Sequence, residues 1–292
     1  MGPQSCDLSE PAGECSTLPT STTKKAPPLG GAFLYGKGRG ELGSEVNQAP
    51  VGPESRTLSE PAGECSTLST SNWLCLYLCC AILLSMDKAH YLHDPCGASS
   101  LPFWKTNNIF IPDDLLILRE DDPRLQEDHA GYIDIPYFKI IHRMQGIEAP
   151  SLPEGYRFAC PDERTLSEHI ASCYEEERVT EAELTAYRLH PTYSPDLWLA
   201  IVDNSTGEIV ASGIGELDRD VGEGILEWIQ VSLAHRRRGW GRIIVNELMF
   251  RLQGKAGFVT VSGKEDDPSS PRDLYEGCGF VGGVVWHVLR KS

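Results

Sequence analysis

The residues best suited to chemistry in this chain are four arginines and two glycines that share nine positions, residues 235–243 (HRRRGWGRI). Guanidinium groups bind phosphate oxygens through charge-assisted hydrogen bonds, and glycine lets the backbone come close to a ligand. The rest of the chain is acidic, because 42 Asp and Glu residues outnumber 26 Lys and Arg, for a formal net charge of −16. Such a field repels a polyanion. The cluster therefore predicts a confined site for a small phosphorylated partner and argues against nucleic acid.

The flanking sequence predicts a strand before this cluster and a helix after it. Residues 224–233 (GILEWIQVSL) are rich in β-branched and aromatic side chains, as in a buried strand. Residues 240–254 repeat apolar side chains at helical spacing, and Gly254 lies where that helix would end. The first N–H groups of such a helix point toward the turn. Together with the helix dipole they form an anion site that the arginines reinforce.

The glycine pattern fits neither common nucleotide motif. A Walker loop needs Lys and then Ser or Thr after its second glycine, but Arg242 and Ile243 follow Gly241, and the dinucleotide fingerprint needs a third glycine. The pattern that fits is R-x-x-G-x-G, from Arg236 to Gly241, with Val231 at the end of the preceding strand. This resembles the acyl-CoA pyrophosphate loop of the GNAT superfamily of N-acetyltransferases.

Neighbouring segments resemble the same family in order. Residues 273–280 (DLYEGCGF) are similar to its closing L-Y-x-x-x-G-F segment, and residues 257–263 before them are typical of a strand. Residues 197–217 predict a β-hairpin. Residues 162–177 and 180–189 predict two helices, the second with a Thr cap and Glu three residues later. The resemblance spans about residues 152–292. It implies an α/β (α+β) fold, in which helices flank a mixed, mostly antiparallel central sheet.

The resemblance also implies which residues hold acetyl-CoA, the expected co-substrate. The backbone N–H of Val231 would donate to the thioester oxygen. Many members have an Asn before the Leu-Tyr pair that contacts the cofactor. This chain has Pro268 and Pro271 in that stretch, and Asp267, offset by one position, is the nearest substitute for the Asn. The pyrophosphate would be held by side chains and backbone of the loop: Arg236, Arg237, Arg238, Gly239, Trp240, Gly241 and Arg242.

Amine acetylation needs a general base and an acid for the departing thiolate. Glu227 is our candidate base, and Glu216 and Asp218 on the preceding hairpin are alternatives. Apolar neighbours of Glu227 should raise its pKa toward neutrality. Tyr275 is the candidate acid. The ordinary alternatives are an exposed strand carboxylate for Glu227 and a packing aromatic ring for Tyr275.

Three functions compete. The first is transfer of an acetyl group from acetyl-CoA to a primary amine, on a small molecule or a peptide, and the acidic balance favours a cationic acceptor such as a polyamine or an amino sugar. The second is a non-catalytic acyl-CoA-binding sensor of the same fold. A nucleic-acid-binding module is the third, and the acidic composition disfavours it.

The cysteines and histidines after residue 86 form no C-x-x-C pair and have no metal-ligand spacing, so we expect no metal. The scattered cysteines favour a reducing, cytoplasmic setting. Cys278 is a conceivable nucleophile, although such thiols usually fill space.

The first half of the chain divides into three expected parts. Residues 1–72 repeat LSEPAGECSTL and are rich in Pro, Gly, Ser and Thr, which predicts disorder. Residues 73–85 are apolar but shorter than the roughly 20 that cross a bilayer, and they lie too deep for a signal peptide. We therefore expect no membrane partner, and Met86 is an alternative start. Residues 86–150 should form an ordered extension, with strands and a helix over residues 135–144, that packs on a transferase domain of residues 151–292.

Overall fold

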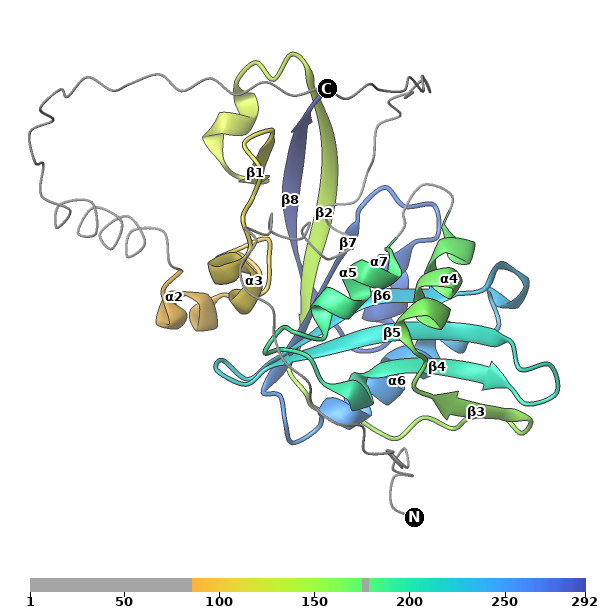
Figure 1. Ribbon diagram of the computed structural model, residues 1–292. Coiled ribbons are helices and arrows are strands. Elements are labelled where there is room, and N and C mark those ends of the chain that lie inside the picture. Colours follow the sequence, from red (N-terminus) through yellow and green to blue (C-terminus); the bar gives the residue numbers. More distant parts are fainter. Residues whose placement is uncertain (1–85, 175–178) are drawn as a thin grey trace, which may run out of the picture. The chain divides into compact units, whose positions relative to one another are not determined.

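The computed structural model describes residues 86–174 and 179–292 (Figure 1). The expectations for residues 1–72 and 73–85 lie outside the described residues. No helix of the described part is both long and apolar enough to cross a membrane.

A mixed sheet of eight strands, in the order β1-β8-β2-β7-β6-β5-β4-β3, lies at the centre of the described part. Within it β6 and β7 pair in parallel, and every other neighbouring pair is antiparallel. The expected mixed, mostly antiparallel sheet is confirmed. The strands are β1 (Leu115–Arg119), β2 (Tyr132–His142), β3 (Tyr156–Ala159), β4 (Trp198–Asp203), β5 (Ile209–Asp218), β6 (Glu223–Val231), β7 (Phe258–Lys264) and β8 (Val281–Lys291).

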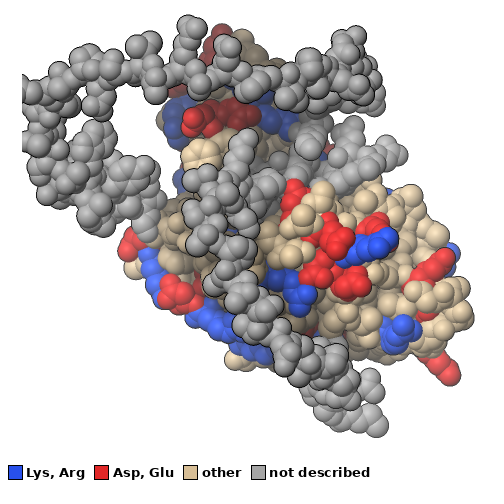
Figure 2. Space-filling model, in the orientation of Figure 1, with Lys and Arg blue, Asp and Glu red and all other residues tan. Residues whose placement is uncertain are grey.

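Helices cover both faces of the sheet. On one face lie α4 (Glu163–Cys173) and α5 (Glu181–Tyr187), with the predicted capping box at Thr180 and Glu183. On the other lies α6 (Trp240–Leu252), followed by α7 (Pro271–Glu276) (Figure 1). Acidic and basic side chains intermingle on the face that carries α4 and α5 (Figure 2). The remaining short elements are α2 (Lys88–His93), α3 (Phe103–Asn108), η1 (Pro123–Gln126), η2 (Pro195–Leu197) and η3 (Leu233–His235).

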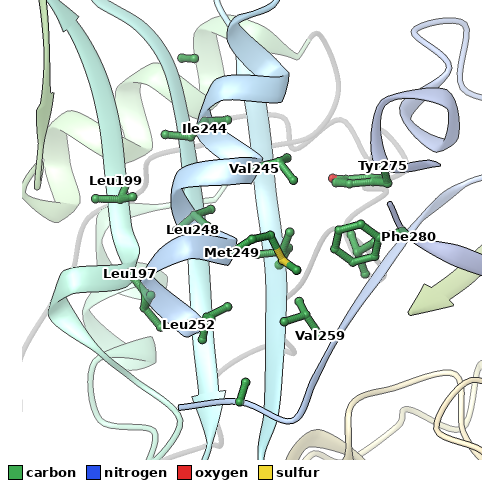
Figure 3. Packing of buried hydrophobic residues seen from close by; sticks show 14 of the residues in the cluster. Leu197, Leu199, Ile244, Val245, Leu248, Met249, Leu252, Val259, Tyr275 and Phe280 are labelled. Atoms are coloured by element: carbon green, nitrogen blue, oxygen red, sulfur yellow. The ribbon is translucent and has the colours of Figure 1, made fainter. Parts of the chain in front are cut away.

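The strands alternate their side chains between the two helical layers. Trp198 packs in the cluster beneath α4 and α5, whereas its neighbour Leu199 packs against α6, as the two-residue period of a strand requires. Figure 3 shows Ile244, Val245 and Leu248 of α6 directed into this second cluster. The predicted helices, hairpin and strand around the arginine cluster are therefore confirmed.

The helix expected over residues 135–144 is wrong, because these residues belong to β2. Strand β2 pairs with β7 on one side and with β8 on the other, and its residues from Tyr137 to His142 are all buried. A central strand buried on both faces has a nearly continuous apolar run instead of an alternating one. Such a run cannot be distinguished from a buried helix by its periodicity.

We expected residues 86–150 to pack on the core, but they contribute strands to its sheet. Strand β2 is inserted between β7 and β8, and β1 extends the same sheet beyond β8. Two of the eight strands therefore come from the segment that precedes residue 151, and the polar groups of α2 and α3 reach residues of β6 directly.

Candidate active site

The arginine loop connects the end of β6 to the start of α6. Gly239 is the residue at the N-terminus of α6, and its φ of 86° lies in the left-handed region that favours glycine. Arg237 also has a positive φ, of 62°. No side chain of the described residues caps the helix. The first N–H groups of this helix of 13 residues therefore remain available to an external anion.

The four arginines of the loop divide into two groups. The guanidinium of Arg236 donates to the carbonyl of Cys173 at 2.9 Å and to the carbonyl of Val231 at 3.3 Å, so it ties the loop to α4 and β6. Arg237, Arg238 and Arg242 are exposed. Within the described ranges these three have no carboxylate partner, which leaves them available to a phosphorylated ligand.

A β-bulge lies in β6 just before Val231. Ser212 of β5 pairs with Gln230, but Ile214 pairs with Glu227, so Trp228 and Ile229 together oppose the single residue Gly213. Trp228 has a φ of 48°. A bulge bends its strand and interrupts the ladder. It lies two residues before the position at which we expected the unpaired donor.

The N–H of Val231 nevertheless faces away from β5. The neighbouring Ser232 N donates to the carbonyl of Val210 at 2.9 Å. Because successive residues of an antiparallel strand direct their N–H groups to opposite sides, the N–H of Val231 is directed toward the side of β7. This is the orientation that the expected oxyanion donor needs.

A pocket opens where β6 and β7 separate. Their parallel pairing ends at Leu226 and Val261, and the following residues of both strands form opposite walls. Glu227 and Tyr275 both line this pocket, so the candidate base and acid are brought together. Other lining residues include Lys105, Tyr137, Tyr174, Trp228, Lys264 and Asp267.

Glu227 is almost completely buried, with 10% of its side chain exposed. Burial raises its pKa to about 7, the neighbouring Glu216 also raises it, and the ammonium of Lys105 opposes both effects. Lys105 Nζ contacts Glu227 Oε1 and lies 3.1 Å from Glu216 Oε2. The second oxygen of Glu227 is buried without a hydrogen-bond partner among the described residues. The expected rise in the pKa of Glu227 is therefore present.

Lys105 is the residue of this site that sequence reasoning missed. It belongs to α3, 122 positions before Glu227, and nothing in its local sequence indicates a site. Of the two alternative bases, Glu216 lies beside Glu227. Asp218 does not line this pocket and pairs with Glu223 at the other end of the β5–β6 ladder.

Tyr275 is buried at one edge of the main apolar cluster. Its ring lies beside that of Phe280 (Figure 3), at 5.7 Å from centroid to centroid. The ring of Phe138 lies 6.3 Å away. Burial raises the pKa of its phenol well above the usual value, so the hydroxyl keeps its proton. Cys278 lines a different pocket, with Arg242 and His142. Burial raises the pKa of this thiol to about 11, which disfavours a nucleophilic thiolate near neutral pH.

The described residues contain no group of three or more His, Cys, Asp or Glu side chains that could hold a metal ion. The chemistry that this pocket itself can support is proton transfer between buried carboxyl, ammonium and phenol groups, beside a loop suited to bind phosphate.

Comparisons with known proteins concern the family and the fold. Residues 163–280 match the model of the acetyltransferase (GNAT) family. A GCN5-related N-acetyltransferase from Sphaerobacter thermophilus has a similar structure, with a TM-score of 0.51 and 22% identity over 61% of this chain and 58% of that one. The chain thus spans less than two thirds of that protein.

Two more distant structures are a GCN5-related N-acetyltransferase from Kribbella flavida (TM-score 0.43, 18% identity, 61% of this chain and 68% of that one) and an acetyltransferase of the GNAT family from Colwellia psychrerythraea (TM-score 0.44, 12% identity, 74% of each chain). No curated protein matches the chain significantly. The family match, together with the shared fold, identifies residues 163–280 as a GNAT acetyltransferase domain.

Proposed function

We propose that this protein transfers an acetyl group from acetyl-CoA directly to a primary amine, with Glu227 as general base and Tyr275 as general acid. The observation that carries the proposal is that both side chains line the pocket where β6 and β7 separate. The arginine loop begins at the end of the same strand β6. A cofactor bound at the loop can therefore direct its acyl end toward these two groups.

Three features of the loop favour a CoA pyrophosphate. The N-terminus of α6 is uncapped, the exposed Arg237, Arg238 and Arg242 are available for ion pairing, and Gly239 lets the backbone approach the ligand. Gly241 has a packing role: a Cβ at this position would lie 3.1 Å from Leu274 of α7, so the glycine lets α6 and α7 approach each other closely. Acetyl-CoA, when bound, supplies an activated thioester.

The chain's own residues would then handle the protons. Glu227, with a pKa of about 7, is partly ionised at neutral pH and can accept a proton from the attacking ammonium. The N–H of Val231 can stabilise negative charge on the thioester oxygen. Tyr275 remains protonated and can donate to the departing sulfur.

The site favours a cationic acceptor. Two buried carboxylates, Glu216 and Glu227, face one lysine, and the second oxygen of Glu227 is buried without a partner in the described part. An ammonium group on the acceptor would supply the missing positive charge. A small-molecule or peptide amine fits this requirement. We also propose a reducing, cytoplasmic setting, on the scattered spacing of the cysteines.

The test replaces the Glu227 carboxylate by an uncharged side chain of the same shape. Thiol release from acetyl-CoA is measured for Glu227→Gln against a panel of polyamines, amino sugars and lysine peptides. We expect kcat/KM to fall about 10²–10⁴-fold, the usual contribution of a general base, with unchanged binding of acetyl-CoA. Wild-type activity should decline as the pH falls below about 7, and the variant should lose this acidic limb, because Gln does not titrate.

Glu208→Gln is the matched control, since Glu208 is exposed in the turn between β4 and β5. An activity of Glu227→Gln within about twofold of the wild type would remove Glu227 from the base role. Binding of acetyl-CoA without thiol release for any amine would favour the acyl-CoA sensor instead.

A further inference from the structure

Among the described residues, the pocket contains one charged residue from outside the GNAT acetyltransferase domain. Lys105 lies on α3, and only 2% of its side chain is exposed. Its ammonium contacts both Glu216 and Glu227, and these two carboxylates raise its pKa, so it carries a positive charge. A buried ammonium is tolerated only when it is well paired. The site is therefore a buried cluster of two carboxylates and one ammonium.

The position of Lys105 is determined by contacts from two strands of the sheet, β6 and β2. Glu223 and Glu227 are four residues apart on β6 and lie on the same face of that strand. Glu223 Oε2 accepts a hydrogen bond from the backbone N–H of Phe103 at 3.0 Å, which fixes the start of α3. Just before α3, Lys139 Nζ of β2 donates to the carbonyls of Ser99 and Leu101 at 2.9 and 2.8 Å. Lys105 thus reaches Glu227 from an anchored backbone.

Among the described residues, Lys105 and Glu216 are the charged groups that shift the pKa of Glu227. His190, which follows α5, packs against Trp104 and stacks on Tyr187. Burial lowers its pKa, so its ring is neutral at neutral pH. The ring of Tyr187 lies 5.8 Å from Lys105 Nζ. Across the pocket, the titratable wall residues are Tyr137 of β2, Tyr174 after α4, Lys264 of β7, Asp267 after β7 and Tyr275 of α7.

We propose that Lys105 is a positioning residue for catalysis: from α3 its ammonium orients the Glu227 carboxylate toward the pocket and keeps it ionised against the charge of Glu216. The segment that precedes the GNAT domain is then part of the catalytic machinery. This inference rests on the proposed role of Glu227 as the base.

The experiment measures the pH dependence of kcat/KM for the full-length chain carrying Lys105→Met or Lys105→Arg. Removal of a positive charge next to a carboxylate raises its pKa, and for a contact at this range the effect is about 1–3 units. The acidic limb of Lys105→Met should move up by that amount, so that the activity lost at neutral pH returns at higher pH. Lys105→Arg retains the charge and should keep the limb near its wild-type position.

Two further variants separate this role from folding. Lys88→Met removes another lysine of the same segment, whose exposed ion pair with Asp220 lies outside the pocket, and it should leave the limb unchanged. The double variant Lys105→Met with Glu216→Gln removes one positive and one negative charge. Its limb should return toward the wild-type value, even if Lys105→Met alone folds poorly.

A second readout does not need turnover. The pKa of Glu227 can be followed by NMR of protein labelled with ¹³C at glutamate carboxyl groups, with the resonance assigned by its loss in Glu227→Gln. If wild-type protein releases no thiol with any amine, the proposed function fails, but this titration still tests Lys105. A pKa of Glu227 in Lys105→Met within about 0.3 unit of wild type, or a limb that moves no more than in Lys88→Met, would overturn the inference.

Discussion

At the residue scale, the site shows how position changes the role of identical side chains. Arg236 and Arg238 are two residues apart in the same loop. Both side chains are exposed. The guanidinium of Arg236 donates to the carbonyls of Cys173 and Val231, whereas Arg238 has no carboxylate partner among the described residues. We therefore propose that Arg236 holds the loop and that Arg238 contacts the ligand.

Replacement of each arginine by Ala tests this division. A charge-assisted hydrogen bond contributes about 1.5–3 kcal/mol. Arg238→Ala should therefore raise the KM for acetyl-CoA about 10-fold or more, without a change in thermal stability. Arg236→Ala should lower the midpoint of thermal unfolding, because two carbonyls lose their donor. Steady-state kinetics and thermal denaturation measure the two effects, and an unchanged KM in Arg238→Ala would contradict a phosphate contact.

At the element scale, the bulge in β6 determines how this strand leaves the sheet. Gly213 of β5 lies opposite the bulge, and its missing side chain provides the space into which Ile229 packs. A Cβ at Gly213 would lie 2.5 Å from Ile229 Cδ1 and 3.1 Å from Leu248 Cδ1 of α6. The bulge, the strand opposite and the helix behind them are therefore packed as one unit.

Gly213→Ala should reduce the free energy of unfolding by about 1–3 kcal/mol, the usual cost of overpacking a core. It should also lower kcat/KM, because the displaced Ile229 lies between Glu227 and Val231. Gly257→Ala is the control, since the nearest atom to its Cβ would be 3.9 Å away, and it should change stability by less than about 0.5 kcal/mol. Denaturant titration compares the variants, and equal stabilities would exclude tight packing at the bulge.

At the scale of the whole molecule, a second buried network joins the segment before the GNAT domain to the sheet. Lys139 of β2 donates to two carbonyls of this segment and to the hydroxyl of Tyr91 at 3.2 Å. Tyr91 in turn donates to Glu223 of β6 at 2.8 Å. Burial lowers the pKa of Lys139 from its ordinary 10.5 to about 8. The contribution of Lys139 to the free energy of unfolding therefore depends on pH.

The sign follows from the protons bound in each state. Between pH 8 and 10.5 the unfolded chain binds more protons at Lys139 than the folded chain does, so the contribution of Lys139 to stability rises with pH in this window and is lost as the pH falls through 8. The unfolding free energy of the wild type, measured relative to Lys139→Met, should thus rise by about 1–3 kcal/mol across the window. Burial raises the pKa values of Cys96 and Tyr91, which has the opposite effect on stability, but both groups remain in the variant. A flat difference in denaturant titrations would contradict the shift.

Local patterns were sufficient to predict much of the transferase half. The β-branched run of β6, the turn glycines and the apolar stripe of α6 correctly predicted strand, loop and helix around the arginines. Thr180 and Glu183 predicted the start of α5. Each of these signals lies within one element, where backbone preference and side-chain period act on adjacent residues. The strand position of Glu227 and its apolar neighbours likewise predicted the direction of its pKa shift.

Other features depend on contacts between residues far apart in the chain. The run over residues 135–144 became a strand because β7 and β8 pair with it on either side, and Lys105 reached Glu227 across 122 positions. The sequence alone thus determined the elements of the GNAT domain and the candidates within it. Only the tertiary structure decided which charges meet, because electrostatic and packing energies depend on distance in space and not on separation along the chain.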